Sequence, residues 1–246
     1  MAWIQIKGYP NTRMEIKLPK VVAKEQYPII RITKQKTGKK VKQKIIGQYS
    51  NGLQYVDVET YKVIVTDKSD SNFKFEFAVA RDAYAVIPGN DKGQIMILSN
   101  MSFEPKDGNV NHYSGKYMPA YPKKNDTPAI KLTQKKSEQM YAEARPDALL
   151  LDYRFKEDIA RGVMIHVGGS YDNENYGHSI SASEGCFGIV NDLNSPNNTS
   201  DKMTKEVIDK IWKQAQKSKS NPNHIRIIIE KRDEKNIPNN IVFTKS

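Results

Sequence analysis

Apolar and polar residues alternate with a period of two through much of the first third of the chain, a pattern typical of β-strands. The candidate strands are residues 4–6, 14–18, 27–32, 41–49, 54–58, 61–66 and 73–80. Residues 36–40, Lys-Thr-Gly-Lys-Lys, have the composition of a hairpin tip, and residues 67–72 that of a second turn. The N-terminal part of the chain is therefore predicted to be a series of strands joined by turns.

The pattern changes after residue 100. Residues 104–121 are rich in Gly, Pro, Asn and Tyr and are predicted to form a long loop, in which Tyr117 and Tyr121 are candidates for lining a groove. Tyrosines that only cover a sheet are the more common alternative. Residues 137–144 have helical composition, and the pair Arg145-Pro146 would end that helix. Further short strands are predicted at residues 95–99, 149–151, 163–165, 187–190, 225–230 and 241–244.

One amphipathic helix is predicted near the C-terminus, behind a cap at residues 199–201. Its apolar face consists of Met203, Val207, Ile208, Ile211, Trp212 and Ala215. Together these elements indicate a mainly β (α+β) fold with few helices. The expected architecture is one catalytic domain over residues 53–246, preceded by a small β module over residues 1–52, or one continuous domain over residues 1–246.

Charge narrows the classes of partner only slightly. The chain has 246 residues, a formal net charge of +11 and a pI near 9.4, which favours polyanions. Six lysines lie between Lys34 and Lys44, but a charged edge strand explains such lysines more often than a binding site does. No interleaved aromatic residues of the kind that stack on bases accompany them. We therefore expect no nucleic-acid partner, and a cytosolic polyanion binder is a minor alternative.

No segment has the composition of a secretory signal or a membrane span. Residues 1–10 lack a continuous apolar core, and no stretch approaches the roughly 20 apolar residues that a membrane-spanning helix needs. The expectation is a protein made in the cytoplasm with no membrane partner. An action outside the cell would then require specialised export or phage lysis.

The most informative chemistry lies in two short segments, residues 165–169 (Ile-His-Val-Gly-Gly) and 183–188 (Ser-Glu-Gly-Cys-Phe-Gly). Cys186 is the only cysteine, so an intramolecular disulfide is excluded. A cysteine attacks as its thiolate, and a histidine is the usual neighbour that takes its proton. His166 follows an apolar run that reads as a buried strand, and Cys186 follows Gly185, where backbone amides could approach a reacting carbonyl oxygen. These residues predict a cysteine nucleophile with a histidine base.

This pattern resembles the catalytic block of the L,D-transpeptidases, the YkuD-like cysteine enzymes of bacterial cell walls. There, a histidine followed by small residues precedes a Ser/Thr-His-Gly-Cys block. Ser183, Gly185 and Cys186 occupy positions of that block. Glu184 stands where the usual members carry a second histidine, and Gly188 where many carry an arginine. Shorter phage-associated and effector-associated variants, with an acidic residue before Gly-Cys, look more similar.

The resemblance implies a role for each residue of the site. His166 would be the base, oriented by the backbone carbonyl of Val167, and Gly185 and Ser183 would shape the oxyanion turn. The implied substrate-binding residues are Glu184, His178, Gly168, Gly169, Tyr117, Tyr121 and Arg161. No cofactor and no metal is expected. Because Gly188 replaces that arginine, the terminal carboxylate of a substrate would have to be bound by Arg154, Arg161 or a lysine instead.

The implied reaction is acyl transfer on peptidoglycan stem peptides through a Cys186 thioester, as an L,D-transpeptidase or an L,D-carboxypeptidase. Such a protein could be an exported antibacterial effector or a phage-linked enzyme, with an immunity or secretion-system protein as a further partner. Two alternatives stay open. One is a non-catalytic wall-binding or polyanion-binding module that retains the fold. The other is a metallopeptidase using His166, His178 and an acidic residue, although no His-Glu-x-x-His or comparable ligand spacing is present.

Overall fold

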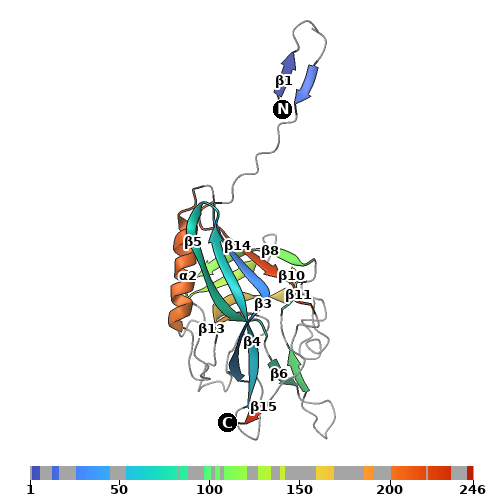
Figure 1. Ribbon diagram of the computed structural model, residues 1–246, viewed down its shortest axis with the longest axis vertical. Coiled ribbons are helices and arrows are strands. Elements are labelled where there is room, and N and C mark those ends of the chain that lie inside the picture. The colour runs from blue at the N-terminus through green and yellow to red at the C-terminus, as the bar shows by residue number, and fades with distance from the viewer. Residues whose placement is uncertain are drawn as a thin grey trace.

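Eight strands pair in a closed circuit, which is the main feature of the fold (Figure 1). In order around the circuit they are β4 (Gln54–Asp67), β3 (Pro28–Lys44), β14 (Ile225–Glu230), β8 (Val110–Met118), β9 (Ala129–Thr133), β12 (Met164–Val167), β13 (Phe187–Val190) and β5 (Asp70–Ala80). The circuit closes because β5 pairs with both β13 and β4. A ninth strand, β15 (Phe243–Lys245), pairs with the first part of β4.

The computed structural model describes residues 2–5, 13–16, 26–44, 54–82, 84–87, 97–100, 103–105, 108–120, 127–133, 139–141, 159–168, 186–190, 201–219, 221–233 and 243–245. Within these residues three further pairs of strands form small antiparallel sheets. They are β1 (Ala2–Gln5) with β2 (Arg13–Ile16), β6 (Tyr84–Ile87) with β7 (Ile97–Asn100), and β10 (Gln139–Tyr141) with β11 (Ile159–Arg161). The described part contains one α-helix, α2 (Asp201–Gln216). The prediction of a mainly β fold is confirmed.

The core lies inside the closed sheet. Alternate residues of each strand point inward, as the period of two requires: Ile30 and Ile32 of β3, Val63 and Val65 of β4, and Ile227 and Ile229 of β14, for example. Helix α2 adds its predicted apolar face to the same cluster through Val207, Ile208, Ile211 and Ala215. The helix contacts β3 and β14 on one side of the circuit and β9, β12 and β13 on the other. It therefore closes one opening of the interior.

Three predicted elements differ from the structure. The expected hairpin tip at residues 36–40 is part of one continuous strand, β3, which pairs with β4 along its length with two register shifts. Gly38, at φ 82°, takes up one irregularity without turning the chain back. Strand β8 occupies half of the loop predicted at residues 104–121, and β10 lies in the segment 137–144 that was predicted to be helical. In each case pairing with a distant strand decides the structure, and local composition does not show it.

Strand β3 also bears on domain organisation. It lies between β4 and β14, so residues 28–44 belong to the same sheet as the central and C-terminal strands. The boundary predicted near residue 52 lies outside the described residues and stays a prediction. The predicted strand at residues 149–151 also lies outside them.

Candidate active site

Two adjacent parallel strands bring His166 and Cys186 to the same face of the sheet. In the register of β12 with β13, Ile165 is paired with Phe187 and His166 with Gly188. Ile165 and Phe187 point into the core, so His166 and Cys186 point outward from neighbouring strands. Cys186 comes one residue before β13 and is therefore two residues short of the position opposite His166. Strand geometry places their Cα atoms about 8 Å apart, a diagonal that two convergent side chains can span.

His166 has a fixed ring orientation. Its Nδ1 lies 2.7 Å from the backbone carbonyl oxygen of Val167, the contact that the resemblance implies. In a neutral ring this bond places the proton on Nδ1, because the carbonyl can only accept, and leaves a lone pair on Nε2. The ring is 1% exposed, and this burial lowers the pKa of His166 to about 4, although the Val167 carbonyl acts in the opposite direction. At neutral pH the imidazole is uncharged and can accept a proton.

Cys186 lies in a small apolar cluster on the outer face. The cluster contains Ala129, Met164 and Cys186, with Met118 packed against it. The Cys186 Sγ donates a long hydrogen bond of 3.9 Å to the Gly162 carbonyl oxygen. The thiol is 8% exposed. Rotation about χ1 into another staggered rotamer is the movement that would bring this sulfur toward the His166 side of the strand pair.

Glycines allow the two strands to approach closely at this point. The Gly168 amide donates to the Ile189 carbonyl oxygen over 2.8 Å. A Cβ on Gly168 would lie 2.5 Å from that oxygen and 2.8 Å from the Gly188 carbonyl carbon, and both are backbone atoms that cannot turn away. Gly168 thus has a structural role at the end of β12. Its predicted role in substrate binding stays a prediction.

A buried network of charged residues supports the strand that follows Cys186. Arg81 donates to the carbonyls of Thr33 and Glu230, at 2.9 and 3.0 Å, and its guanidinium lies 5.8 Å from the centre of the Phe187 ring. Glu104 accepts from both Arg81 and Arg232. This network therefore ties Thr33 of β3 and the last residue of β14, Glu230, to the residue next to Cys186.

Arg232 completes the network from the end of β14. It also bonds to Asp82 and to the Tyr61 hydroxyl, at 3.0 and 2.9 Å. Burial lowers the pKa of Arg81 to about 10. Burial acts the same way on Arg232, but Asp82 and Glu104 outweigh it and raise the pKa of Arg232 above its usual value. Sequence reasoning missed this network, since its members lie up to 171 residues apart and no local motif marks them.

The other predicted site residues are placed only in part. Tyr117 lies on β8, where its ring stacks on Trp212 with centroids 4.6 Å apart, and its hydroxyl donates to Asp209 over 3.1 Å. The ring and the hydroxyl of Tyr117 thus both contact helix α2. Strand β9 lies between its strand, β8, and β12, which carries His166. Arg161 is the last residue of β11. The remaining candidates, Gly169, His178, Ser183, Glu184, Gly185 and Tyr121, and also Arg154, lie outside the described residues.

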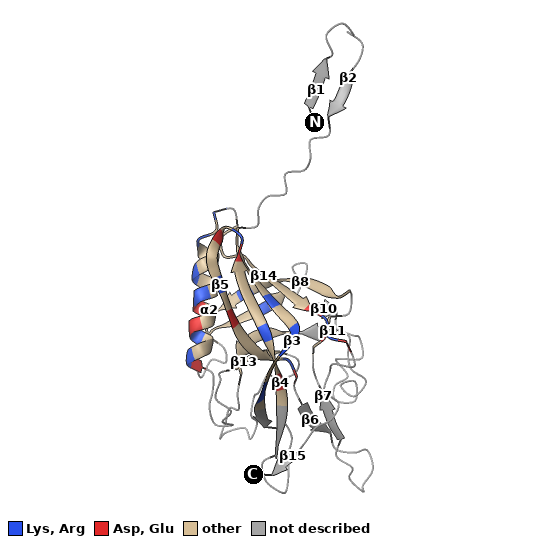
Figure 2. Ribbon diagram, in the orientation of Figure 1, with Lys and Arg blue, Asp and Glu red and all other residues tan. Residues whose placement is uncertain are grey.

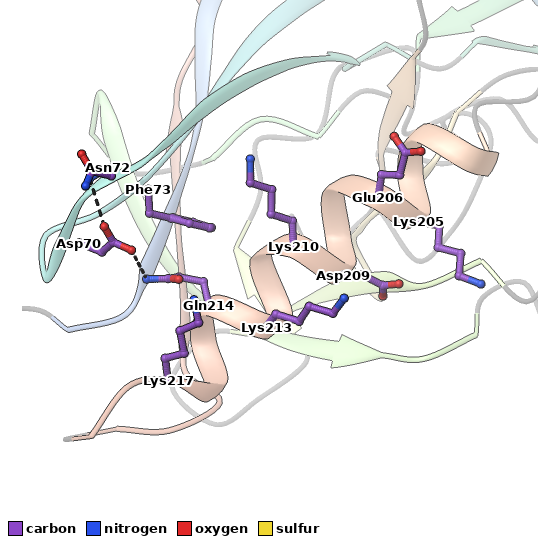
Figure 3. A pocket seen from close by; sticks show the side chains of 10 residues that line it. All are labelled: Asp70, Asn72, Phe73, Lys205, Glu206, Asp209, Lys210, Lys213, Gln214 and Lys217. Atoms are coloured by element: carbon purple, nitrogen blue, oxygen red, sulfur yellow. Dashed lines mark hydrogen bonds between the residues drawn. The ribbon is translucent and has the colours of Figure 1, made fainter.

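A groove of about 660 Å³ lies between α2 and the start of β5 (Figure 3). Lys205, Lys210, Lys213 and Lys217 line it, and the Lys210 ammonium lies 4.2 Å from the centre of the Phe75 ring. Three carboxylates, those of Asp70, Glu206 and Asp209, line the same groove. Because the opposite charges nearly balance, the groove has little preference for an anion.

Within the described ranges, His, Cys, Asp and Glu side chains form no group of three or more that could hold a metal ion. No helix in the described part of the chain has the length and apolar character needed to cross a membrane.

Comparison of the chain with models of known protein families, with curated proteins and with solved structures gave no match. What supports a function is therefore the geometry of the residues themselves and the resemblance of the short block around Cys186.

Proposed function

We propose that the protein is a cysteine acyltransferase or peptidase of the L,D-transpeptidase type, acting on peptidoglycan stem peptides. The observation that carries the proposal is the pairing of β12 with β13. It places a thiol and a neutral imidazole with a fixed tautomer on one face of two parallel strands. This is the nucleophile and base arrangement that thiol catalysis requires.

The electrostatics favour a general base over a preformed ion pair. The low pKa of His166 disfavours an imidazolium beside a resting thiolate. The resting site is then a thiol and a neutral imidazole, and the proton moves as the sulfur attacks. The Val167 carbonyl stabilises the proton already on Nδ1 and becomes a stronger partner when Nε2 is protonated.

The proposed reaction has two halves. Nε2 of His166 takes the thiol proton as Sγ bonds to the carbonyl carbon, which gives a tetrahedral oxyanion. The C–N bond then breaks, the proton passes from Nε2 to the departing D-alanine amine, and a thioester remains on Cys186. An amine acceptor would give a cross-link or an exchanged D-amino acid, and water would give carboxypeptidase action. Either nucleophile returns its proton through His166 and restores the thiol.

The fold and the place of action belong to the same proposal. The closed, mainly β sheet with His166 and Cys186 on neighbouring parallel strands is compatible with an L,D-transpeptidase-like domain. By that resemblance the protein acts in the periplasm or cell wall after specialised export, as an antibacterial effector or a phage-linked enzyme. An immunity or secretion-system protein would then be its protein partner.

The test is incubation of the purified protein with muropeptides that carry tetrapeptide stems, followed by mass analysis. Loss of a terminal D-alanine, with or without a new cross-link, supports the proposal and reports the reaction type. Cys186→Ser is the matched control because it keeps a small polar side chain and removes the thiol. Unchanged muropeptides with the wild-type protein, together with alkylation of Cys186 no faster than in the unfolded chain, would favour the non-catalytic binding module.

A further inference from the structure

Phe187, the residue that follows Cys186, is held in the core by two directional contacts. Its ring is fully buried, and it meets the Phe103 ring edge to face, with centroids 6.2 Å apart and planes at 88°. The Arg81 guanidinium lies 5.8 Å from the centre of the same ring. Edge-to-face rings and a cation over a ring are both favourable, and the cation contact is stronger where water is excluded. The two contacts therefore restrict how the Phe187 ring can move.

The position of the Phe187 ring bears directly on that of the neighbouring thiol. Phe187 begins β13 with its side chain in the core, and Cys186, one residue earlier, directs its side chain to the outer face. The two Cα atoms are joined by one planar peptide unit and lie about 3.8 Å apart. A shift of the strand at Phe187 thus moves the Cys186 sulfur on the other face by a comparable distance.

Both holding residues are fixed by the buried charge network. Glu104, next to Phe103, accepts from the side chains of Arg81 and Arg232 and from the Arg232 amide. Figure 2 shows charged residues along the strands and α2. The lysines of α2 are exposed, whereas Arg81, Glu104 and Arg232 are at most 3% exposed. A buried charge that leaves its partner loses its compensation, so the network keeps Phe103 and Arg81 in one arrangement around Phe187.

We propose that Phe103 and Arg81 are positioning residues for Cys186, which act through the Phe187 ring and hold the thiol within reach of the His166 imidazole. The inference rests on the proposed function, in which His166 takes the proton of this thiol. Both residues contact the core-facing side chain of β13 and not the reacting atoms. A misplacement of about 1 Å can cost about 10²-fold in rate. Loss of either contact should therefore weaken the assistance from His166 without removing the thiol.

The test compares two substitutions of phenylalanine by leucine in the full chain. Phe103→Leu removes the ring that meets Phe187, whereas Phe77→Leu removes another buried ring of the same core, whose ring contact is with Phe75. Both substitutions keep a large apolar side chain, so similar losses of stability are expected, and urea unfolding measures them. Alkylation of Cys186 by iodoacetamide is then followed between about pH 6 and about pH 9.

We expect Phe103→Leu to slow alkylation about tenfold at pH 7 and to leave the rate at pH 9 unchanged. At pH 7 the reaction depends on removal of the thiol proton by His166, whereas at pH 9 most of an ordinary thiol is already ionised. Phe77→Leu should alkylate as the wild type does at both pH values. A general loosening of the fold would act in the opposite direction, because a more accessible thiol reacts faster at every pH.

Turnover gives a second readout. With muropeptides, Phe103→Leu should lower kcat about tenfold and leave KM unchanged, because the core-facing ring does not contact the substrate. Arg81→Lys keeps a cation but loses the rigid fork that serves two carbonyls and Glu104, and it should give the same selective loss at pH 7. If Phe103→Leu is not folded, Phe103→Met replaces it, since methionine fills irregular space in a core.

Several results would overturn the inference. A wild-type pH dependence of alkylation in Phe103→Leu, with slower alkylation at pH 7 in His166→Ala, would remove the positioning role and leave the proposed function intact. Equal slowing in Phe103→Leu and Phe77→Leu would show a general response of the core. Faster alkylation of Phe103→Leu at every pH would show that the ring only shields the thiol. Wild-type alkylation in His166→Ala would overturn the proposed function together with this inference.

Discussion

His166 and Gly188 lie directly opposite one another on adjacent parallel strands. Gly188 in turn is paired with Ala80 of β5, so the row beside the imidazole contains no side chain larger than a methyl group. An arginine at residue 188, as in many members of the resembled family, would project next to the ring. In the proposed function, glycine at this position removes the group that would bind a substrate carboxylate beside His166.

The buried imidazole should make stability fall in mild acid. The folded pKa of His166 is about 4, below the unfolded value of about 6.5, so the unfolded chain binds more protons between these values. Stability is then fully present above pH 6.5 and is lost as the pH falls toward 4, by about 3 kcal/mol in total. Urea unfolding at several pH values would measure this. His166→Asn should flatten the profile over this range, and Cys186→Ala, which keeps the imidazole, should not.

The assignment of the base can be tested with the thiol itself. If His166 assists loss of the Cys186 proton, His166→Ala should slow iodoacetamide alkylation at pH 7, and the rate should recover as the pH approaches about 8.5. Turnover of muropeptides should fall by about 10² to 10⁴ in the same variant. His178→Ala should have a smaller effect on both. The opposite order, with His178→Ala shifting the thiol titration and His166→Ala leaving it unchanged, would assign the base to His178.

Gly168→Ala should destabilise the fold where β12 meets β13. The new Cβ would lie 2.5 Å from the Ile189 carbonyl oxygen, so the strand ends must separate, at a cost of about 1–3 kcal/mol. Thermal or urea unfolding would measure the loss. Gly38→Ala is the comparison because a Cβ there meets nothing within 4 Å and only its φ of 82° is unfavourable. Gly168→Ala should also lower activity, whereas Gly38→Ala should not.

Neutralising Glu104 should destabilise the fold far more than neutralising a partly exposed acidic residue. Glu104→Gln removes the charge between two fully buried guanidinium groups, which should cost about 3–5 kcal/mol. The matched control is Glu230→Gln, which breaks the partly exposed pair with Arg31 and should cost at most about 1 kcal/mol. Similar losses of stability in the two variants would show that the Glu104 charge is not needed to compensate the buried Arg81 and Arg232 charges.

The sequence predicted those elements whose burial pattern is local. The strands at residues 61–66, 73–80 and 225–230 lie within β4, β5 and β14, and the helix with Val207, Ile208 and Ile211 on its buried face is α2. A period of two or of 3.6 is set by neighbours a few residues apart, so one sequence contains it. The Nδ1 bond of His166 is also local, because its acceptor is the next residue.

The sequence could not predict features that depend on distant pairing. Strand β8 has no clear apolar period, because Gly115 fits where Ile130, Ile227 and Ile225 leave no room for a Cβ. Its position between β14 and β9 makes it a strand. The network of Arg81 and Arg232 also depends on distant segments. In the sequence alone, each of its charged residues is indistinguishable from a solvated surface residue.

The closed circuit also determines when the chain can fold during synthesis. Strand β14, residues Ile225–Glu230, lies between β3 and β8, which precede it by more than 100 residues. A nascent chain that ends before β14 has both of these edges unpaired, and the core lacks Ile225, Ile227 and Ile229. Closure of the circuit must therefore wait until β14, its last strand in the sequence, has left the ribosome.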